Sequence, residues 1–209
     1  MFKDRYDAAA KLAQQLMSYK GDPNVVILAI PRGGLELGYV LSKELQVPLD
    51  IVLTKKIGFP GNPEYAIGAL SLEDDFVDER LAMTPDIKEH VDKEIKRLRA
   101  MLLERDVQYH KKTKPIPLEG KTVIITDDGI ATGRTLHATI QVVKKKQPAN
   151  IIVAIPVAPP EAITNLKDMV DQVVCLETPT PFFSVGQFYD IFRQVEDEEA
   201  IRLLDEANQ

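Results

Sequence analysis

The chain is poor in several residue types that mark particular classes of protein. Its 209 residues include no tryptophan and one cysteine, Cys175, which excludes an intramolecular disulfide and a multi-cysteine zinc site. The three histidines, His90, His110 and His137, do not have the spacing of a histidine metal site. No run of about 18 apolar residues occurs, so we expect no transmembrane helix and no membrane partner.

The chain also has fewer basic than acidic residues. There are 26 Lys and Arg residues against 32 Asp and Glu residues, which gives a net charge of −6. A general nucleic-acid binder normally has a basic face, so no nucleic-acid partner is expected, although a small phosphorylated ligand is compatible with a locally positive pocket. The N-terminal residues lack the apolar segment of a secretory signal. With neither an export signal nor a disulfide, we expect a cytoplasmic protein.

What remains is the composition of an ordinary α/β protein with a substantial core. Short continuous apolar runs, typical of buried strands, alternate with helical stripes. Strands are predicted at 25–30, 49–53, 66–72, 122–126, 151–155 and 172–176, and helices at 4–19, 35–45, 84–110, 134–145, 160–169 and 196–206. This alternation predicts a Rossmann-like parallel sheet flanked by helices. Ligands of such sheets bind beyond the C-terminal ends of the strands, where the Gly-rich segments 31–34 and 127–133 fall.

The ten residues TDDGIATGRT, at 126–135, carry the strongest chemical signal. They place two adjacent carboxylates, Asp127 and Asp128, after an apolar strand, and a Gly-rich loop then opens a helix. Small residues and a helix N-terminus suit a phosphate, to which Thr132 and Thr135 can add hydroxyl donors. Carboxylates suit the hydroxyls of a diol. A diol beside a phosphate matches ribose 5-phosphate.

The longer string VIITDDGIATGRT resembles the 5-phosphoribosyl 1-pyrophosphate (PRPP) motif of type I phosphoribosyltransferases. The resemblance implies that Asp127 and Asp128 hold the ribose 2′- and 3′-hydroxyls. It also implies that the 5′-phosphate is wrapped by Ala131, Thr132, Gly133, Arg134 and Thr135. Gly129 departs from the family, which more often has an apolar residue there, so added flexibility is expected. The alternative is an Asp-Asp-Gly turn followed by a helix cap. Neither a nucleoside-triphosphatase loop nor a dinucleotide-binding glycine motif is present.

The first Gly-rich loop, Ile30-Pro31-Arg32-Gly33-Gly34, resembles the pyrophosphate-binding loop of the same family. There the backbone amides of Gly33 and Gly34 would hold the leaving group, and the Arg32 guanidinium can donate two bonds to phosphate oxygens. A plain turn with a solvent-facing arginine is the alternative. The next strand is expected to end with Lys55 and Lys56. Lys56 is the preferred ligand because it lies nearer the following loop, and two solvated lysines are the alternative.

Further strings extend the resemblance over the whole chain. Residues 58–63 are rich in Gly, Pro and Asn and are similar in position to the family's flexible loop over the reacting centre. NPEYAIGAL, PVAPPE and FFSVGQFY resemble a subgroup of predicted, poorly characterised phosphoribosyltransferases. We therefore expect one domain over 1–209 with a lid or insert at about 57–117 and a C-terminal hood at about 177–209. Four aromatic residues of the hood form either a stacking wall for a ring or a hydrophobic anchor: Phe182, Phe183, Phe188 and Tyr189.

The resemblance implies an enzyme that moves a 5-phosphoribosyl group from PRPP to an unidentified nucleobase or small amine and releases pyrophosphate. Asp127, Asp128 and Arg32 would be its catalytic residues. Mg²⁺ is the expected cofactor, held mainly by pyrophosphate and ribose oxygens and water, with either carboxylate orienting a water. The alternative is a non-catalytic regulatory protein that senses PRPP or a nucleotide. Arg32, the Gly-rich lid and the lysine pair favour catalysis, because a sensor could lose them. The sequence leaves a homodimer open.

Overall fold

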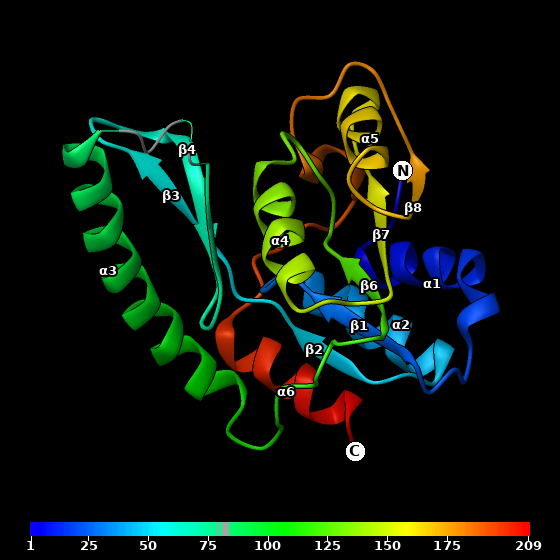
Figure 1. The fold of residues 1–209 in the computed structure, drawn as a ribbon. Coiled ribbons are helices and arrows are strands. Elements are labelled where there is room, and N and C mark those ends of the chain that lie inside the picture. Colours follow the sequence, from blue (N-terminus) through cyan, green and yellow to red (C-terminus); the bar gives the residue numbers. More distant parts are fainter. Residues whose placement is uncertain (79, 81–83) are drawn as a thin grey trace.

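The computed structural model of the chain describes residues 1–78, 80 and 84–209. Its centre is a five-stranded sheet in the order β2-β1-β6-β7-β8 (Figure 1). The strands are β1 (Val25–Ala29), β2 (Leu49–Ile51), β6 (Thr122–Thr126), β7 (Asn150–Val157) and β8 (Gln172–Glu177). Every neighbouring pair is parallel. The predicted Rossmann-like parallel sheet is therefore confirmed.

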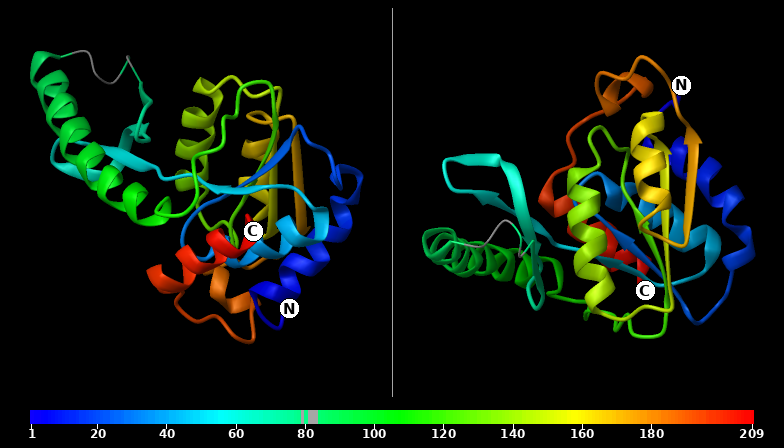
Figure 2. Two further views of the ribbon diagram at one scale, coloured as in Figure 1. Left: turned by 90° about the horizontal axis from the view of Figure 1, so that it is seen from below. Right: turned by 45° about the horizontal axis from the view of Figure 1, so that its top comes forward.

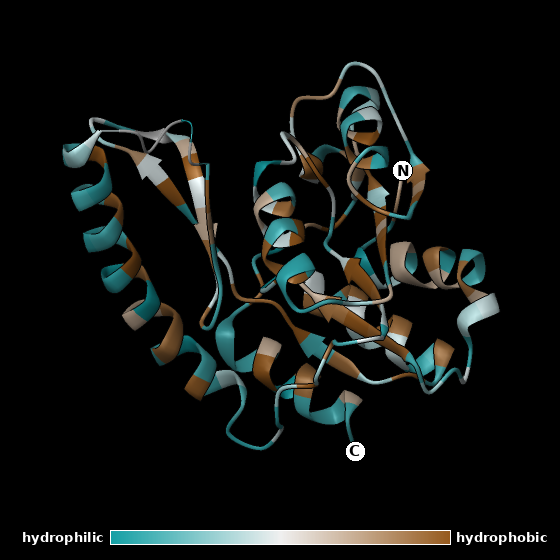
Figure 3. Ribbon diagram, viewed as in Figure 1, coloured by the Kyte–Doolittle hydropathy of each residue, from teal (hydrophilic) through white to brown (hydrophobic). Residues whose placement is uncertain are grey.

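Helices cover both faces of this sheet. One face carries α1 (Arg5–Gln15), α2 (Gly34–Leu45) and α6 (Asp197–Ala207), and the other carries α4 (Arg134–Lys145) and α5 (Pro160–Lys167). Because successive strand residues point to opposite faces, Ile27 packs in one core and Leu28 in the other. Figure 3 shows apolar residues along the strands and on the helix sides turned toward them. Two short 3-10 helices, η1 (Met17–Tyr19) and η2 (Val185–Phe188), complete this part.

An insert with its own small core stands beside the parallel sheet (Figures 1 and 2). It consists of an antiparallel sheet in the order β3-β4-β5 and a long helix. Its elements are β3 (Lys55–Phe59), β4 (Asn62–Leu70), β5 (Asp75–Val77) and α3 (Pro85–Tyr109). The helix predicted at 84–110 is confirmed as α3, with Thr84 as its cap and Pro85 in its first turn. No helix in the described residues is both long and apolar enough to cross a membrane.

The start of the insert differs from the sequence-based expectation. The predicted strand at 49–53 ends at Ile51, and the lysines begin β3 instead of ending a parallel strand. The predicted loop at 58–63 shrinks to a turn at Pro60 and Gly61, where Gly61 has a φ of 77°. The acidic residues after β4 lead into β5, which begins at Asp75. Gly and Pro favour loops locally, but pairing across the hairpin satisfies the backbone and overrides that preference.

The insert is attached to the rest of the chain along α4. Ala69 of β4 packs with Ala138 and Val142 of α4, and the two alanines allow close approach. Lys146, just after α4, forms ion pairs with Glu73 and Asp74 beyond β4. The insert therefore lies against the helix whose first residues, Arg134 and Thr135, end the segment that resembles the PRPP motif.

Candidate active site

The two Gly-rich loops meet at one edge of the parallel sheet. One follows β1 and the other follows β6, and these strands are neighbours. The Ile30 amide donates to the Thr126 carbonyl oxygen at 3.0 Å. A Cβ on Gly34 would lie 2.9 Å from the same oxygen, so only glycine lets the first loop pass this close to β6. The fold thus brings the predicted pyrophosphate and ribose-phosphate loops side by side.

Asp127 and Asp128 form a carboxylate pair at this edge. The Asp128 amide donates to Oδ1 of Asp127 at 2.9 Å. Burial, together with the neighbouring Asp128 charge, raises the pKa of Asp127 well above its ordinary value. Burial also raises the pKa of Asp128, although the Arg5 guanidinium opposes this shift. Partners that donate hydrogen bonds or carry positive charge would stabilise such a pair.

Two residues that the sequence did not connect with Asp128 hold it in place. The Nε of Arg5 donates to Asp128 Oδ2 at 2.8 Å, and the Tyr189 hydroxyl donates to the Asp128 carbonyl oxygen at 2.6 Å. Burial raises the pKa of Tyr189, which keeps its proton available for this bond. Arg5 lies 123 positions from Asp128 along the chain, so no local pattern could have connected the two.

The segment after the carboxylates opens α4 without a side-chain cap. Gly133 precedes the helix with a φ of 71°. Among the residues that the structure describes, the amides of Thr135 and Leu136 have no acceptor. Ala131 and Thr132 are exposed beside them. Uncapped amides, the helix dipole and a threonine hydroxyl form a surface suited to a phosphate.

The structure explains why position 129 is a glycine: there is no space for a side chain. The added flexibility expected from the sequence is not needed as an explanation. A Cβ at this position would lie 2.7 Å from Val185 Cγ1 and 2.9 Å from Val157 Cγ1. The next amide, of Ile130, donates to the Val157 carbonyl oxygen at 3.0 Å. The segment is therefore pressed between β7 and the C-terminal part of the chain.

A cavity of about 270 Å³ extends the site toward the insert. Its basic lining residues are Lys55 and Lys56 of β3 and Arg105 of α3. Pro31 of the first loop and Thr135 of α4 lie on its other sides. Arg105 is a further residue that the sequence did not predict, and its Nη2 donates to Asp197 Oδ1 at 3.2 Å. The basic residues of the insert thus share a cavity with one residue from each predicted loop segment.

The sequence left open which of Lys55 and Lys56 faces a ligand. Lys56 is paired across the hairpin with Ala69, which packs on α4. Lys56 therefore lies on the hairpin face turned toward α4, and Lys55 on the other face. Both lysines nevertheless line the cavity.

Arg32 lies in the first loop and is partly exposed. Its Nη1 is 3.7 Å from Glu196 Oε2, just before α6. At this distance the interaction is a loose ion pair, so the guanidinium keeps its hydrogen-bond donors for another partner.

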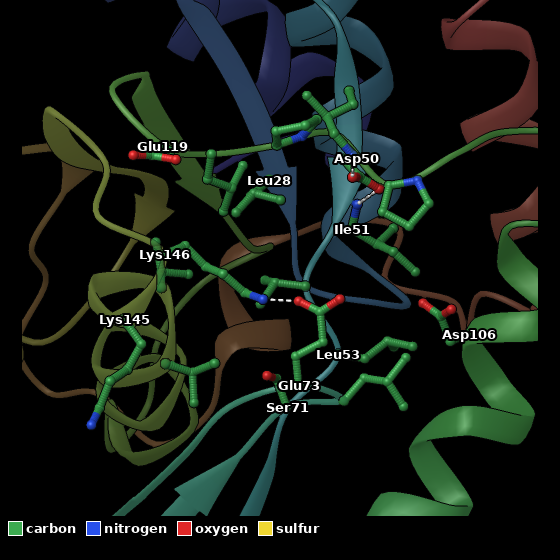
Figure 4. A pocket seen from close by; sticks show the side chains of 18 of the residues that line it. Leu28, Asp50, Ile51, Leu53, Ser71, Glu73, Asp106, Glu119, Lys145 and Lys146 are labelled. Atoms are coloured by element: carbon green, nitrogen blue, oxygen red, sulfur yellow. Dashed lines mark hydrogen bonds and ion pairs between the residues drawn. The ribbon is translucent and has the colours of Figure 1, made fainter.

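A larger cavity, of about 580 Å³, lies between α4, the insert and the segment after α3 (Figure 4). None of the predicted site residues lines it. Several of its charged groups pair with one another: Lys146 contacts Glu73, and His110 contacts Asp50. The charged and polar groups that the sequence analysis singled out converge instead at the sheet edge, outside this larger cavity.

The aromatic residues of the C-terminal segment mainly pack together. Phe182 and Phe188 have ring centroids 4.9 Å apart, and Tyr189 lies 5.5 Å from Phe2. Phe183 is the exception, with 83% of its surface exposed. The structure favours a hydrophobic anchor over a continuous stacking wall.

A carboxylate pair beside an uncapped helix, at the C-terminal edge of a parallel sheet, defines an α/β protein suited to a sugar phosphate. Residues 2–190 match the model of the family described as phosphoribosyl transferase domain. The chain belongs to this family.

Two curated relatives agree with this assignment, and one solved structure has nearly the same fold over the whole chain. The chain is 36% identical to two Mycobacterium tuberculosis proteins, Rv0571c and MT0597, which are named provisionally as phosphoribosyl transferases. The match covers 100% of this chain but 47% of theirs, so the chain spans about half the length of these curated relatives. The crystal structure of TT1426 from Thermus thermophilus is 35% identical with a TM-score of 0.90, covering 100% of this chain and 99% of that one.

Proposed function

We propose that the protein transfers a 5-phosphoribosyl group from PRPP to an unidentified acceptor, a nucleobase or small amine, and releases pyrophosphate. One observation carries the proposal. The carboxylate pair and the uncapped start of α4 lie beside the Arg32-Gly33-Gly34 loop at a single sheet edge. Membership of the phosphoribosyl transferase family supports it.

Each part of PRPP has a chemically matched partner in this arrangement. Asp127 and Asp128 would accept hydrogen bonds from the ribose hydroxyls, and residues 131–135 would hold the 5′-phosphate. Arg32 and the amides of the first loop would bind the pyrophosphate group, with Lys56 facing it across the cavity. Phosphates at both ends would leave the anomeric carbon between the two loops.

The reaction is a displacement at that carbon. Its bond to the pyrophosphate oxygen breaks and pyrophosphate keeps the electron pair. The lone pair of an acceptor nitrogen forms the new bond, and the proton of that nitrogen passes to water. Positive charge develops on the ribose while negative charge develops on the leaving group. The basic side chains would stabilise the leaving group, and the carboxylates would hold the ribose in position. Catalysis of this kind requires positioning and charge rather than a protein nucleophile.

Magnesium is part of the proposal. In the described part of the chain, no group of three or more His, Cys, Asp and Glu residues could enclose a metal ion. The adjacent carboxylates of Asp127 and Asp128 fit an ion that is held mostly by substrate oxygens and water, as Mg²⁺ prefers. When bound, Mg²⁺ would neutralise charge on the pyrophosphate group. Asp127 or Asp128 would hold one of its waters.

The decisive experiment screens nucleobases and small amines with PRPP and Mg²⁺, and detects pyrophosphate. We expect release with at least one acceptor, and calorimetry should show PRPP binding. The double variant Asp127→Asn/Asp128→Asn should lose both signals while remaining folded. Asp92→Asn, an exposed carboxylate on α3, is the matched control. PRPP binding without release for any acceptor would favour a regulatory sensor, and a wild-type protein that does not bind PRPP would contradict the proposal.

A further inference from the structure

Arg5 is a buried cation that joins four separate segments of the chain. It is the first residue of α1, and its side chain is 6% exposed. Nε donates to Asp128 Oδ2 at 2.8 Å, while Nη1 donates to Glu36 Oε2 at 3.2 Å and to the Arg193 carbonyl oxygen at 2.9 Å. The guanidinium carbon lies 4.0 Å from the centroid of the Phe192 ring. Contacts on several sides fix the plane of the guanidinium.

The first Gly-rich loop leaves room for this contact. A Cβ on Gly33 would lie 2.2 Å from Asp128 Oδ2 and 3.1 Å from Arg5 Nε. Any larger residue would push the guanidinium and the carboxylate apart. The loop that we assign to pyrophosphate therefore also shapes the Arg5–Asp128 pair.

The pair uses one oxygen of Asp128 and leaves the other available. Oδ2 accepts from Arg5, whereas no other residue in the described part of the chain donates a hydrogen bond to Oδ1. The Asp128 side chain is 16% exposed, and Tyr189 holds its backbone carbonyl. A carboxylate anchored at its backbone and at one oxygen presents the other oxygen in a fixed direction.

We propose that Arg5 is a positioning residue of the ribose site, which aligns Asp128 so that Oδ1 accepts a ribose hydroxyl. This inference rests on the proposed function. Arg5 acts through Asp128 and does not itself contact the sugar. Glu36 strengthens the arrangement, because its other oxygen accepts from Arg193 Nη2 at 2.7 Å and so ties the C-terminal segment to the same network. The donor site is thereby coupled to the segment that we expected to form the hood.

If Arg5 has only a structural role, replacing it should weaken the binding of every ligand alike. Comparing two ligands therefore separates a structural role from a positioning role. PRPP contains the ribose, whereas pyrophosphate does not. In Arg5→Lys, the buried positive charge remains but the planar fork is lost. We expect its PRPP affinity to fall about tenfold or more, as for a weakened charge-assisted hydrogen bond. Pyrophosphate affinity should stay within about twofold of wild type. Lys11→Met, which removes an exposed cation from the same helix, should change neither.

The measurements are calorimetric Kd values for PRPP and for pyrophosphate, each with Mg²⁺, together with the Tm of each variant. Tyr189→Phe provides a second test, since it removes the bond to the Asp128 carbonyl and keeps all charges; it too should weaken PRPP selectively. If both ligands weaken in parallel with a falling Tm, Arg5 is only structural and the inference is overturned. Unchanged PRPP affinity in Arg5→Lys overturns it as well. A wild-type protein that fails to bind PRPP would instead contradict the proposed function.

Discussion

His110, at the end of α3, lies with its Nε2 2.9 Å from Oδ1 of Asp50 on β2, and its Nδ1 2.8 Å from Oδ1 of Asp106. The ring thus joins the returning end of the insert to the parallel sheet. Asp50 Oδ2 also accepts from the Ile116 amide at 2.7 Å, so the segment after α3 is fastened at two adjacent points. Burial alone would lower the pKa of His110, but its pairing with the two carboxylates outweighs burial and raises it.

We predict that the His110 pairing stabilises the protein most at acidic pH. Because the pKa of His110 is raised in the folded state, its contribution is fully present below the unfolded value of about 6.5 and is lost as pH rises through the folded value. His110→Gln should therefore lower the free energy of unfolding by about 1–3 kcal/mol near pH 6, and by less near pH 9. Denaturant titrations at several pH values test this. A cost for His110→Gln that does not change with pH would contradict the prediction.

Asp127→Asn should separate stability from ligand binding. Burial and the adjacent Asp128 raise the pKa of Asp127, so its favourable contribution lies at low pH and is lost as pH rises. At neutral pH the buried charge is a cost, and the neutral amide should increase the free energy of unfolding by on the order of 1 kcal/mol. The same change should weaken PRPP binding, since the amide is a weaker acceptor for the ribose hydroxyls. Thermal unfolding and calorimetry measure the two effects, and a less stable variant with full PRPP affinity would refute the reasoning.

Gly129→Ala should be destabilising although an apolar residue is expected there from the family resemblance. Its Cβ would collide with Val157 and Val185, and overpacking of this kind costs about 1–3 kcal/mol. Adding Val185→Ala should recover part of the loss by removing one of the two contacts. The free energy of unfolding from urea titration is the readout. Val185→Ala alone serves as the reference, and no recovery in the double variant would show that the contact with Val185 is unimportant.

The basic cavity predicts that the insert contributes to pyrophosphate binding. Lys56→Met and Arg105→Met should each weaken pyrophosphate binding about tenfold, and the loss should shrink as salt is added. Calorimetry at two ionic strengths checks both points. Lys93→Met, an exposed lysine on α3 paired with Glu89, is the matched control. Wild-type pyrophosphate affinity in Lys56→Met and Arg105→Met would show that the cavity does not hold the anion.

The parallel sheet and the predicted ribose-phosphate segment were readable from the sequence because their signals are local. An apolar run, two carboxylates, a Gly-rich loop and a helix follow one another within residues 122–145, and the structure reproduces that order as β6, the loop and α4. The start of α3 was equally readable, since a threonine cap and a proline at the first position act within one turn. Such signals need no knowledge of what packs against them.

The strands of the insert were harder to predict from the sequence, and Lys55 and Gly61 show the physical reason. β3 is half-exposed, and its two lysines, glycine and aromatic residue give no clear alternation. It becomes a strand because β4 pairs with it and α3 covers it. The local preference of Gly and Pro for a loop correctly located the turn but overestimated its length.

The sequence by itself determined the order of strands and helices, the family resemblance, and the position of the carboxylate pair and Gly-rich loops at strand ends. Only the tertiary structure decided which side chains meet there. Arg5, Arg105 and Tyr189 come from α1, α3 and the C-terminal segment, and side chains so distant along the chain are brought together by packing alone. Periodicity reports how each residue meets solvent or core, whereas contacts between distant segments depend on how the completed layers are stacked.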